Sequence, residues 1–447
     1  MDFILSNNII YPKQYGFLHG RSTEHAITDV LLDLIEGIEN KTFPLAVFLD
    51  LTKAFDSISH TILIRKMYRY GIRGTALDWF KSYLTNRAQF VQIDLERSSN
   101  KSIDFGVPQG SVLGPILFLL YINDLPSCSD ILSFTLFADD TTALYNSSSL
   151  DDAFQTVNNE LDHLNSWMSS NNLAVNVSKT NFVLFMTRQK FLKTTFNDHH
   201  YLTMSSKPVL QKDGVKFLGL LIDNNLTFNN HINHICSKLL IGIYALRRAS
   251  KVLASNDLKT LYSSLILPYL NYNLLAWGGA CKLQTKYKIL NQGENSNPMK
   301  NLTKLHKLQK RALRIVAKAS YHSHHIPLCH DLKLPDLPDL YNVKSLVFFY
   351  DFYHGNLPPT LSHIFSFRSG RNNELFIKIS HRRTDIASSS LVHTLPEIWN
   401  CLPFELKLEI IKSKKTFINK VKTHYISKYK EWSCTTFDCY SCKQSLI

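Results

Sequence analysis

The sequence predicts an α+β fold, because short apolar β-type runs alternate with segments of helical periodicity up to residue 223, and helical periodicity dominates after it. The length of 447 residues exceeds what one hydrophobic core usually holds. A content of 45% hydrophobic and 19% charged residues is typical of a folded protein. We therefore expect a protein of several lobes, built on a sheet with helices packed on one face.

The individual elements follow from local patterns. Short apolar or β-branched runs predict strands over residues 45–49, 90–95, 133–137, 141–145, 182–185 and 216–222. Apolar residues at helical spacing predict helices over residues 26–38, 62–70, 76–84, 116–122, 150–169, 231–252, 258–275 and 302–316. The polar, turn-rich run 291–298 is predicted to be a linker, and Pro335 to Pro338 to mark another boundary.

Three aspartates stand at predicted strand ends. Asp139 and Asp140 lie between two apolar runs, which places them at the tight turn of a predicted hairpin, and Asp50 ends the run 45–49. Carboxylates held a few ångströms apart repel, which raises the pKa of one of them unless a cation offsets the charge. Two Mg²⁺ ions about 4 Å apart would do so. Taken alone, the pair 139–140 indicates two ordinary turn aspartates more strongly than a metal site, and the surrounding motifs are needed to favour the metal site.

Further motifs share the order and spacing of one family. They are Gln14-Tyr15-Gly16-Phe17, Gly20-Arg21-Ser22-Thr23, the Gly/Pro-punctuated loop 106–115, Asn171-Asn172-Leu173 followed by Lys179-Thr180, and Lys216-Phe217-Leu218-Gly219. With these motifs, from about Gln14 to Ile222, the chain resembles the reverse transcriptase of non-LTR retrotransposons of the jockey and CR1-like lineages. The run 306–315 is similar to a segment of the same elements beyond the thumb.

The resemblance implies a right-hand polymerase with four parts. Partial fingers are expected over 1–44, the palm with its catalytic motifs over 45–224, a helical thumb over 225–290, and a basic, mixed C-terminal region over 291–447. It also implies an N-terminal truncation that removes fingers strands and an endonuclease domain. Because those strands would close over the nucleotide, the isolated chain is expected to polymerise poorly.

The implied activity is that of an RNA-directed DNA polymerase, which joins a dNTP to a primer 3′-hydroxyl on an RNA template with two Mg²⁺ ions as cofactor. Asp50 and Asp139 would bridge the metals, with Asp140 and the Leu51 carbonyl as further ligands. Lys179 would be a general acid toward pyrophosphate, although a solvated lysine fits as well. The second hypothesis is a catalytically inactive nucleic-acid-binding remnant of such an enzyme.

The resemblance also implies substrate contacts. Phe55 would lie against the sugar 2′ position and exclude ribonucleotides, with an ordinary core phenylalanine as the alternative. Gln109 and Gly110 would hold the nascent base pair, and Arg21 would pair with dNTP phosphates. Leu18 departs from the family, which usually has a basic residue there. The primer grip is assigned to Phe217, Leu218 and Gly219, where a core β-turn would have the same sequence.

The net charge of +14 is unevenly placed, since residues 1–200 carry 16 Lys/Arg and 21 Asp/Glu, whereas residues 201–447 carry 34 and 15. An acidic metal-binding part followed by a basic duplex-binding part would produce this asymmetry. A basic surface without nucleic acid is the alternative. Residues 225–330 are expected to bind a template–primer duplex through Lys238, Arg247, Arg248, Lys251, Lys307, Lys310, Arg311 and Arg314.

The sequence also bears on membrane insertion, on the cellular compartment and on metal sites other than the aspartates. The sequence contains no run of 18 apolar residues, so it predicts no membrane-spanning helix. The N-terminus lacks the pattern of a signal peptide, and scattered cysteines suit reduced thiols, so the nucleus or cytoplasm is expected. The cysteines at 434, 439 and 442 leave a zinc site with His424 as fourth ligand undecided. The histidines at 322, 324, 325 and 330 lack regular ligand spacing and are predicted to form a polar loop.

Overall fold

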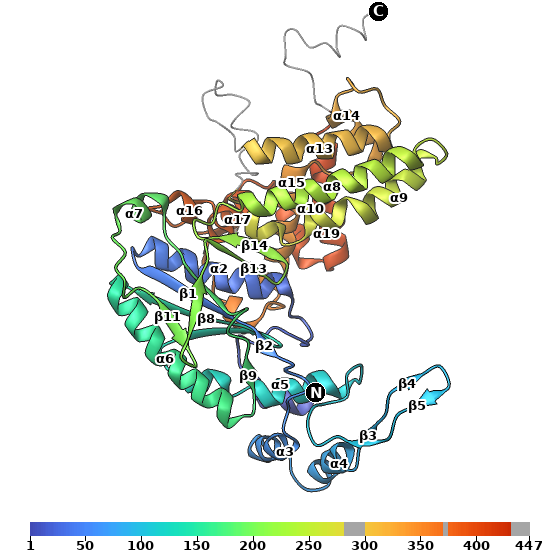
Figure 1. Cartoon of the computed structure of the whole chain (residues 1–447). Helices are drawn as coiled ribbons and strands as arrows, with labels where there is room; N and C mark the ends of the chain where they lie inside the picture. Colours follow the sequence, from blue (N-terminus) through green and yellow to red (C-terminus); the bar gives the residue numbers. More distant parts are fainter. Residues whose placement is uncertain (281–299, 370–373, 431–447) are drawn as a thin grey trace, which may run out of the picture. The chain divides into compact units, whose positions relative to one another are not determined.

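The computed structural model describes residues 1–280, 300–369 and 374–430. The chain divides into two compact units, which are drawn together in Figure 1. The first comprises residues 1–218 and 358–360, and the second comprises residues 219–357 and 361–447. The predicted linker 291–298 and the C-terminal cysteines lie outside the described residues, so both stay predictions.

A six-stranded sheet forms the centre of the first unit, in the order β11-β12-β10-β1-β8-β7. All neighbours pair antiparallel except β10 and β12, which run parallel. The strands are β1 (Phe43–Leu49), β7 (Ser133–Phe137), β8 (Asp140–Ser147), β10 (Asn181–Leu184), β11 (Leu202–Met204) and β12 (Lys207–Gln211). Four of the six predicted strands lie in this sheet, namely 45–49, 133–137, 141–145 and 182–185.

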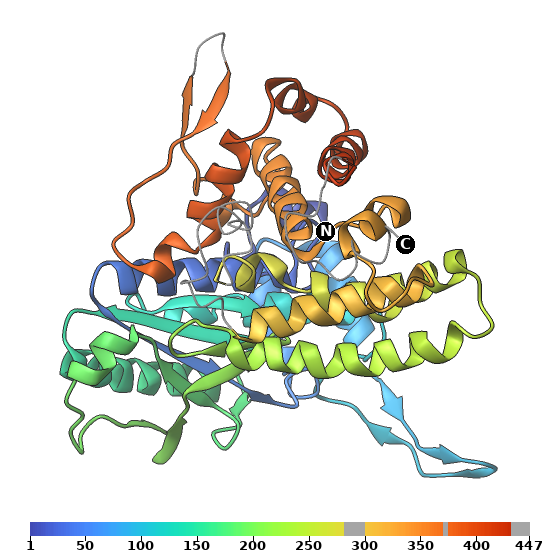
Figure 2. The same cartoon turned by 90° about the horizontal axis from the view of Figure 1, so that it is seen from above.

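Helices cover both faces of this sheet, which corrects the expectation of one covered face. On one face, α6 (Leu150–Ser170) packs against alternate residues of the strands, and Phe154 meets Phe182 edge to face. On the other face lies α2 (Thr23–Glu39), whose Asp29 accepts a hydrogen bond from Thr135 of β7. Figure 2 shows the two helices on opposite sides of the strands. The strands are buried on both faces, so their apolar runs do not alternate with polar residues as a one-sided sheet would require.

The remaining elements of the first unit surround the loop 106–112. The buried helix α5 (Leu113–Ile122) packs against α3 (His60–Arg69), which in turn contacts α4 (Gly74–Leu84). Between α4 and α5 the chain forms a long hairpin of β3 (Ala88–Gln89), β4 (Gln92–Ile93), β5 (Glu96–Arg97) and β6 (Lys101–Ser102). The predicted strand 90–95 is therefore too long, because Asp94 and Leu95 form the tip of that hairpin.

The first unit is completed by short elements and by one segment from late in the chain. Residues 358–360 reach it through Thr360, whose hydroxyl lies 2.7 Å from that of Tyr15. The short elements are α1 (Asp2–Ser6), β2 (Leu51–Thr52), β9 (Ala174–Val175), α7 (Arg188–Lys193) and β13 (Gly214–Phe217).

The second unit is mainly helical. The helix α13 (Lys300–Val316) packs along α8 (Asn229–Ala249) and α9 (Ser255–Leu265), and α15 (Leu337–Tyr353) packs against α17 (Leu391–Asn400) and α19 (Lys414–Ser427). Its other elements are β14 (Leu220–Asp223), α10 (Leu267–Asn271), α11 (Leu274–Trp277), α14 (His325–Leu332), β15 (Phe367–Ser369), β16 (Leu375–Ile377), α16 (Asp385–Ser388) and α18 (Phe404–Leu408). In the described part of the chain, no helix is both long and apolar enough to cross a bilayer.

Two predicted elements need correction, and the predicted boundary at 335–338 falls between two helices. The predicted strand 216–222 is interrupted at Leu218 and Gly219, which have φ values of 43° and 82°. The predicted helix 258–275 is divided into α9, α10 and α11. Pro268 has no N–H to continue the hydrogen bonds of α9, and Asn273, with a φ of 48°, separates α10 from α11. The segment 335–338 lies within the second unit, where it separates α14, which ends at Leu332, from α15, which begins at Leu337.

Candidate active site

Asp139 lies in a two-residue turn between β7 and β8, and Asp140 is the first residue of β8. The ladder pairs Phe137 with Asp140, which leaves Ala138 and Asp139 as the turn. The buried Ala138 has a φ of 56°, in the left-handed region that residues with a side chain rarely adopt. The hairpin turn predicted from the sequence is confirmed, and the two carboxylates lie at its tip.

Asp50 reaches the same end of the sheet from β1. The ladder between β1 and β8 pairs Leu49 with Thr141, so Asp50 and Asp140 come next in the same antiparallel register. The backbone of Asp50 is fixed on both sides. Its N–H donates to the Thr180 hydroxyl at 3.3 Å, and its carbonyl accepts from the Asn176 N–H at 2.7 Å. Neighbouring strands thus carry all three carboxylates to one edge of the sheet.

The three carboxylates influence one another electrostatically. Desolvation, followed by the charges of Asp139 and Asp50, raises the pKa of Asp140. Lys179 supplies a cation, with its Nζ 3.9 Å from Asp50 Oδ2, but both side chains are largely solvated, at 69% and 42% exposure. An excess of carboxylate oxygens suits hard divalent cations. The joint ligand set of the three aspartates stays a prediction.

Gln14 supports the turn, a role that the sequence did not reveal. Its side chain is buried, and Oε1 accepts hydrogen bonds from the backbone N–H groups of Ala138 at 3.1 Å and Gly16 at 2.9 Å. A Cβ on Gly16 would lie 2.4 Å from the Ala138 nitrogen, so only glycine allows this approach. The motif 14–17 was recognised, but its contact with residues 124 positions away depends on the tertiary fold.

Phe55 is half-buried and held in place by other rings. Its ring stacks on Phe118 of α5 with centroids 4.4 Å apart, and Phe17 meets it edge to face at 6.2 Å. Its carbonyl accepts from the Val107 N–H at 3.1 Å, which ties it to the loop 106–112. This rigid, partly exposed position agrees with both the sugar-gate and the core interpretation, so the gate stays a prediction.

Gln109 and Gly110 lie on the exposed part of the loop 106–112. Gln109 donates from Nε2 to Asp56 Oδ1 at 2.8 Å, and Gly110 has a φ of 81° with open space where a Cβ would be. Beside them is a cavity of about 650 Å³, bounded by the base of the β3–β6 hairpin and residues 105–109. Polar groups from Asp56, Arg87 and Gln89 line this cavity. Gln109 therefore borders this cavity directly, and its base-pair contact and that of Gly110 stay predictions.

Arg21 is engaged by its own loop. Its Nη1 donates to the carbonyl oxygens of Pro12 at 2.6 Å and Gln14 at 2.5 Å, and its guanidinium lies 5.9 Å from the Tyr15 ring centre. Burial lowers the pKa of this guanidinium. Arg21 thus stabilises the segment that supports the 138–139 turn, and its phosphate contact stays a prediction. Leu51 starts β2 and pairs with Val175, which leaves the role of its carbonyl equally untested.

The predicted primer grip forms a sharp turn. Phe217 is buried, with its ring 5.6 Å from that of Phe48. A Cβ on Gly219 would lie 3.1 Å from the Tyr272 ring, so glycine is required for this close approach as well as for its positive φ. The boundary between the two units falls directly after Leu218. The β-turn alternative describes the backbone correctly, and the primer contact stays a prediction.

Comparison with known proteins supplies the family. Residues 2–222 match the family model "Reverse transcriptase (RNA-dependent DNA polymerase)". The chain contains a reverse transcriptase domain. This segment holds the three aspartates, Phe55 and Gln109, so the family recognised from the motifs and the α+β polymerase fold are confirmed.

The relatives point to the same lineage. The chain is 28% identical over 348 residues to a probable RNA-directed DNA polymerase from transposon X-element of Drosophila melanogaster, covering 76% of this chain and 36% of that protein. It is 29% identical over 343 residues to the RNA-directed DNA polymerase from mobile element jockey of the same organism, covering 73% and 34%. The chain thus spans about a third of the length of these relatives.

Among solved structures, telomerase from Candida albicans is similar at a TM-score of 0.33 and 13% identity, covering 69% of this chain and 49% of that one.

Proposed function

We propose that this chain catalyses RNA-directed DNA synthesis, the transfer of a nucleotide from a dNTP to a primer 3′-hydroxyl. The observation that carries the proposal is the meeting of Asp50, Asp139 and Asp140 at one sheet edge, with the pKa of Asp140 raised by burial and by the other two charges. Such a group of negative charges repels itself and destabilises the folded protein unless bound cations neutralise it.

The residues present fit a pair of divalent cations, with Asp50, Asp139, Asp140 and the Leu51 carbonyl as ligands. Bound Mg²⁺ would lower the pKa of the primer hydroxyl and neutralise the leaving pyrophosphate. Lys179, whose Nζ lies 3.9 Å from Asp50 Oδ2, would give a proton to pyrophosphate. Phe55, fixed against Phe118, restricts the sugar, and Gln109 orients the incoming base beside the cavity.

We propose an RNA template, a DNA primer and dNTPs as partners, and the nucleus or cytoplasm as the compartment. The relatives from transposon X-element and from mobile element jockey are RNA-directed DNA polymerases by name, which supports RNA-directed synthesis. The free thiols of Cys128, Cys236 and Cys401 suit a reducing compartment.

The test is primer extension on poly(rA)/oligo(dT) with Mg²⁺ and dTTP. The chain should extend the primer at a low rate, and Asp139→Asn should abolish extension, because the amide offers one neutral oxygen in place of a charged ligand. Asp162→Asn on the exposed side of α6 removes the same charge away from the site and should leave extension intact. Duplex binding without any extension would instead support the inactive remnant.

A further inference from the structure

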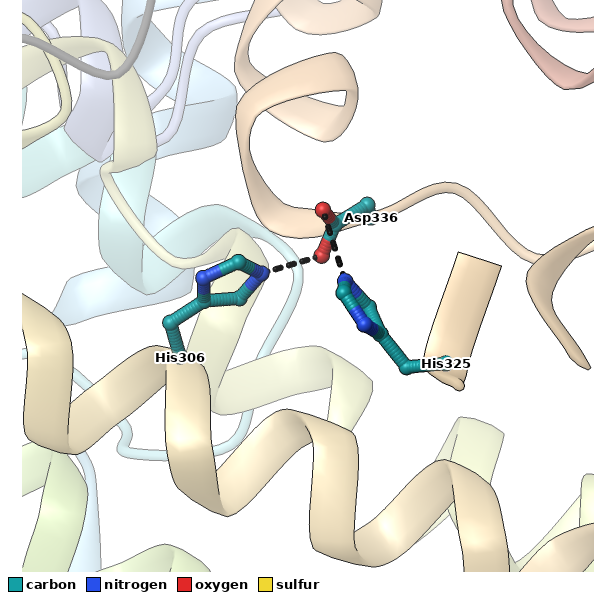
Figure 3. A group of neighbouring side chains, drawn as sticks. All are labelled: His306, His325 and Asp336. Atoms are coloured by element: carbon teal, nitrogen blue, oxygen red, sulfur yellow. Dashed lines mark hydrogen bonds and ion pairs between the residues drawn. The ribbon is translucent and has the colours of Figure 1, made fainter. Parts of the chain in front are cut away.

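Three side chains that are far apart in sequence meet in the second unit, away from the aspartates described above. His306 lies within α13, His325 is the first residue of α14, and Asp336 directly precedes α15. One ligand atom from each lies within 4.8 Å of the other two. Figure 3 shows both imidazole rings directed at the same carboxylate.

Asp336 is a fully buried carboxylate, with 0% of its side chain exposed. Its Oδ1 accepts from the Leu337 N–H at 3.0 Å and lies 2.7 Å from His306 Nε2. A buried charge needs a cation or several donors to offset its desolvation. The imidazole of His306 and the Leu337 N–H lie at Oδ1, and the imidazole of His325 lies beside Oδ2.

His325 faces this second oxygen without a hydrogen bond. Its Nε2 is buried and lies 3.5 Å from Asp336 Oδ2. A neutral imidazole is the form that ligates metals.

The distance between His325 and Asp336 matches the spacing of two ligands on one metal ion. Zinc holds nitrogen and oxygen ligands at about 2.1 Å, so neighbouring ligand atoms in a tetrahedral site lie about 3.4 Å apart. The 3.5 Å between His325 Nε2 and Asp336 Oδ2 is such a ligand-to-ligand distance. We propose that His306, His325 and Asp336 bind one divalent transition-metal ion, Zn²⁺, which joins α13, α14 and the start of α15.

Binding requires one local change. The 2.7 Å contact between His306 Nε2 and Asp336 Oδ1 must open to ligand spacing, and the Nε2 proton must leave to solvent or move to Nδ1. The positive charge of Lys310 acts on His325 and opposes a second cation, whereas the carboxylate favours it. The side chains of His306 and His325 keep 22% and 14% exposure, which gives the ion and a water ligand access.

The ligand types select the metal. Two imidazoles and one carboxylate suit borderline ions such as Zn²⁺ better than Mg²⁺ or Ca²⁺, which prefer all-oxygen shells. With three protein ligands, a fourth position remains for water. The site is thus distinct in chemistry from the carboxylate cluster of the first unit.

The test uses Co²⁺, a spectroscopic substitute for Zn²⁺, added to the full chain. One equivalent should produce the intense visible d–d bands of a tetrahedral complex, without a thiolate-to-cobalt charge-transfer band, and Zn²⁺ should displace it. His306→Ala and His325→Ala should each remove the bands. A charge-transfer band that persists in both variants would instead place the metal on cysteines and overturn the proposal.

A matched control separates ligand loss from damage to the helix. His330→Ala lies on the same α14, where its side chain pairs with Asp331 at 3.2 Å and is outside the cluster. This variant should keep the bands. His306→Ala should keep the helical circular dichroism of the parent, because alanine is favourable in a helix. Absence of tetrahedral bands in the parent chain, or bands that both ligand variants retain, would show that the group is only a hydrogen-bonded cap of α15.

Discussion

At the scale of single residues, Phe55 offers the sharpest test of substrate selection. Its ring is fixed by Phe118, so Phe55→Val removes the part of the side chain that would meet a 2′-hydroxyl. We expect discrimination between dTTP and UTP on poly(rA)/oligo(dT) to fall by roughly ten- to two-hundredfold, the range for loss of a steric contact. The ratio of kcat/KM for dTTP to kcat/KM for UTP measures this discrimination.

The control for this substitution is Phe90→Val on the exposed β3–β6 hairpin, which should leave the ratio unchanged. If Phe55→Val also leaves it unchanged, Phe55 is a core residue and no gate.

Gln14 tests whether the 138–139 turn needs its support. Gln14→Met keeps the length of the side chain but leaves the buried N–H groups of Ala138 and Gly16 without their acceptor. The expected loss is about 1–3 kcal/mol of unfolding free energy, together with a lower kcat for primer extension. Urea denaturation and extension assays measure the two effects. Gln189→Met, on the exposed side of α7, should change neither.

The raised pKa of Asp140 predicts a dependence of stability on pH. The folded state binds the proton more tightly than the unfolded state, so this group lowers stability as pH rises from the ordinary aspartate pKa, about 3.9, through its raised value. Asp140→Asn should therefore be more stable than the parent at neutral pH in the absence of divalent ions. The gain should vanish in acid, below the ordinary pKa.

Denaturation curves across this pH range provide the measurement. Asp162→Asn on α6 controls for the loss of one negative charge. An equal difference between Asp140→Asn and the parent at all pH values would contradict the electrostatic interpretation of the site.

At the scale of elements, the end of α14 carries a strained residue. Lys333 has a φ of 53° and a ψ of 41°, its N–H donates to the His330 carbonyl, and the Leu334 N–H donates to the Cys329 carbonyl. This is a helix end that favours glycine. Lys333→Gly should raise the unfolding free energy by about 0.5–1 kcal/mol.

A lysine-to-glycine substitution inside a helix should have the opposite effect on the unfolding free energy. Lys307→Gly, at an exposed position of α13, should lower the unfolding free energy by about 1 kcal/mol. Thermal or urea unfolding of both variants decides the matter, and a loss of stability in Lys333→Gly would show that its conformation is not strained.

At the scale of the whole molecule, the charge asymmetry predicts salt-dependent duplex binding. The helices α8 and α13 pack together, and both carry predicted phosphate contacts, of which Arg247, Arg248 and Arg311 are exposed. The logarithm of the affinity for an RNA–DNA duplex should fall linearly with the logarithm of the salt concentration, with a slope of about −0.9 per phosphate contact. Fluorescence anisotropy at several salt concentrations measures the slope.

Neutralising two of these cations should change the slope in a defined way. Replacement of Arg247 and Arg248 by glutamine should reduce it by roughly two. The same replacement of Lys420 and Lys422, on α19, should leave it unchanged. An affinity that does not vary between low and physiological salt would contradict the proposed duplex surface.

The sequence by itself determined the family, the six-stranded sheet's main strands and the turn between β7 and β8. Each of these depends on local information: apolar runs define β1, β7, β8 and β10, and a two-residue turn must follow where two such runs end on adjacent aspartates. Boundaries failed where a left-handed residue or a proline broke a continuous apolar pattern, as at Leu218 and Pro268.

Only the tertiary structure decided which distant side chains support or form a site. Gln14 reaches the Ala138 N–H, Thr180 holds Asp50, and His306 meets His325 and Asp336 because folding brings together segments that the spacing of residues does not relate. The histidines at 325 and 330 belong to α14 and not to the predicted polar loop. Hydrogen bonds and metal ligation act over about 2–3 Å in space, and a one-dimensional pattern carries no information about such distances.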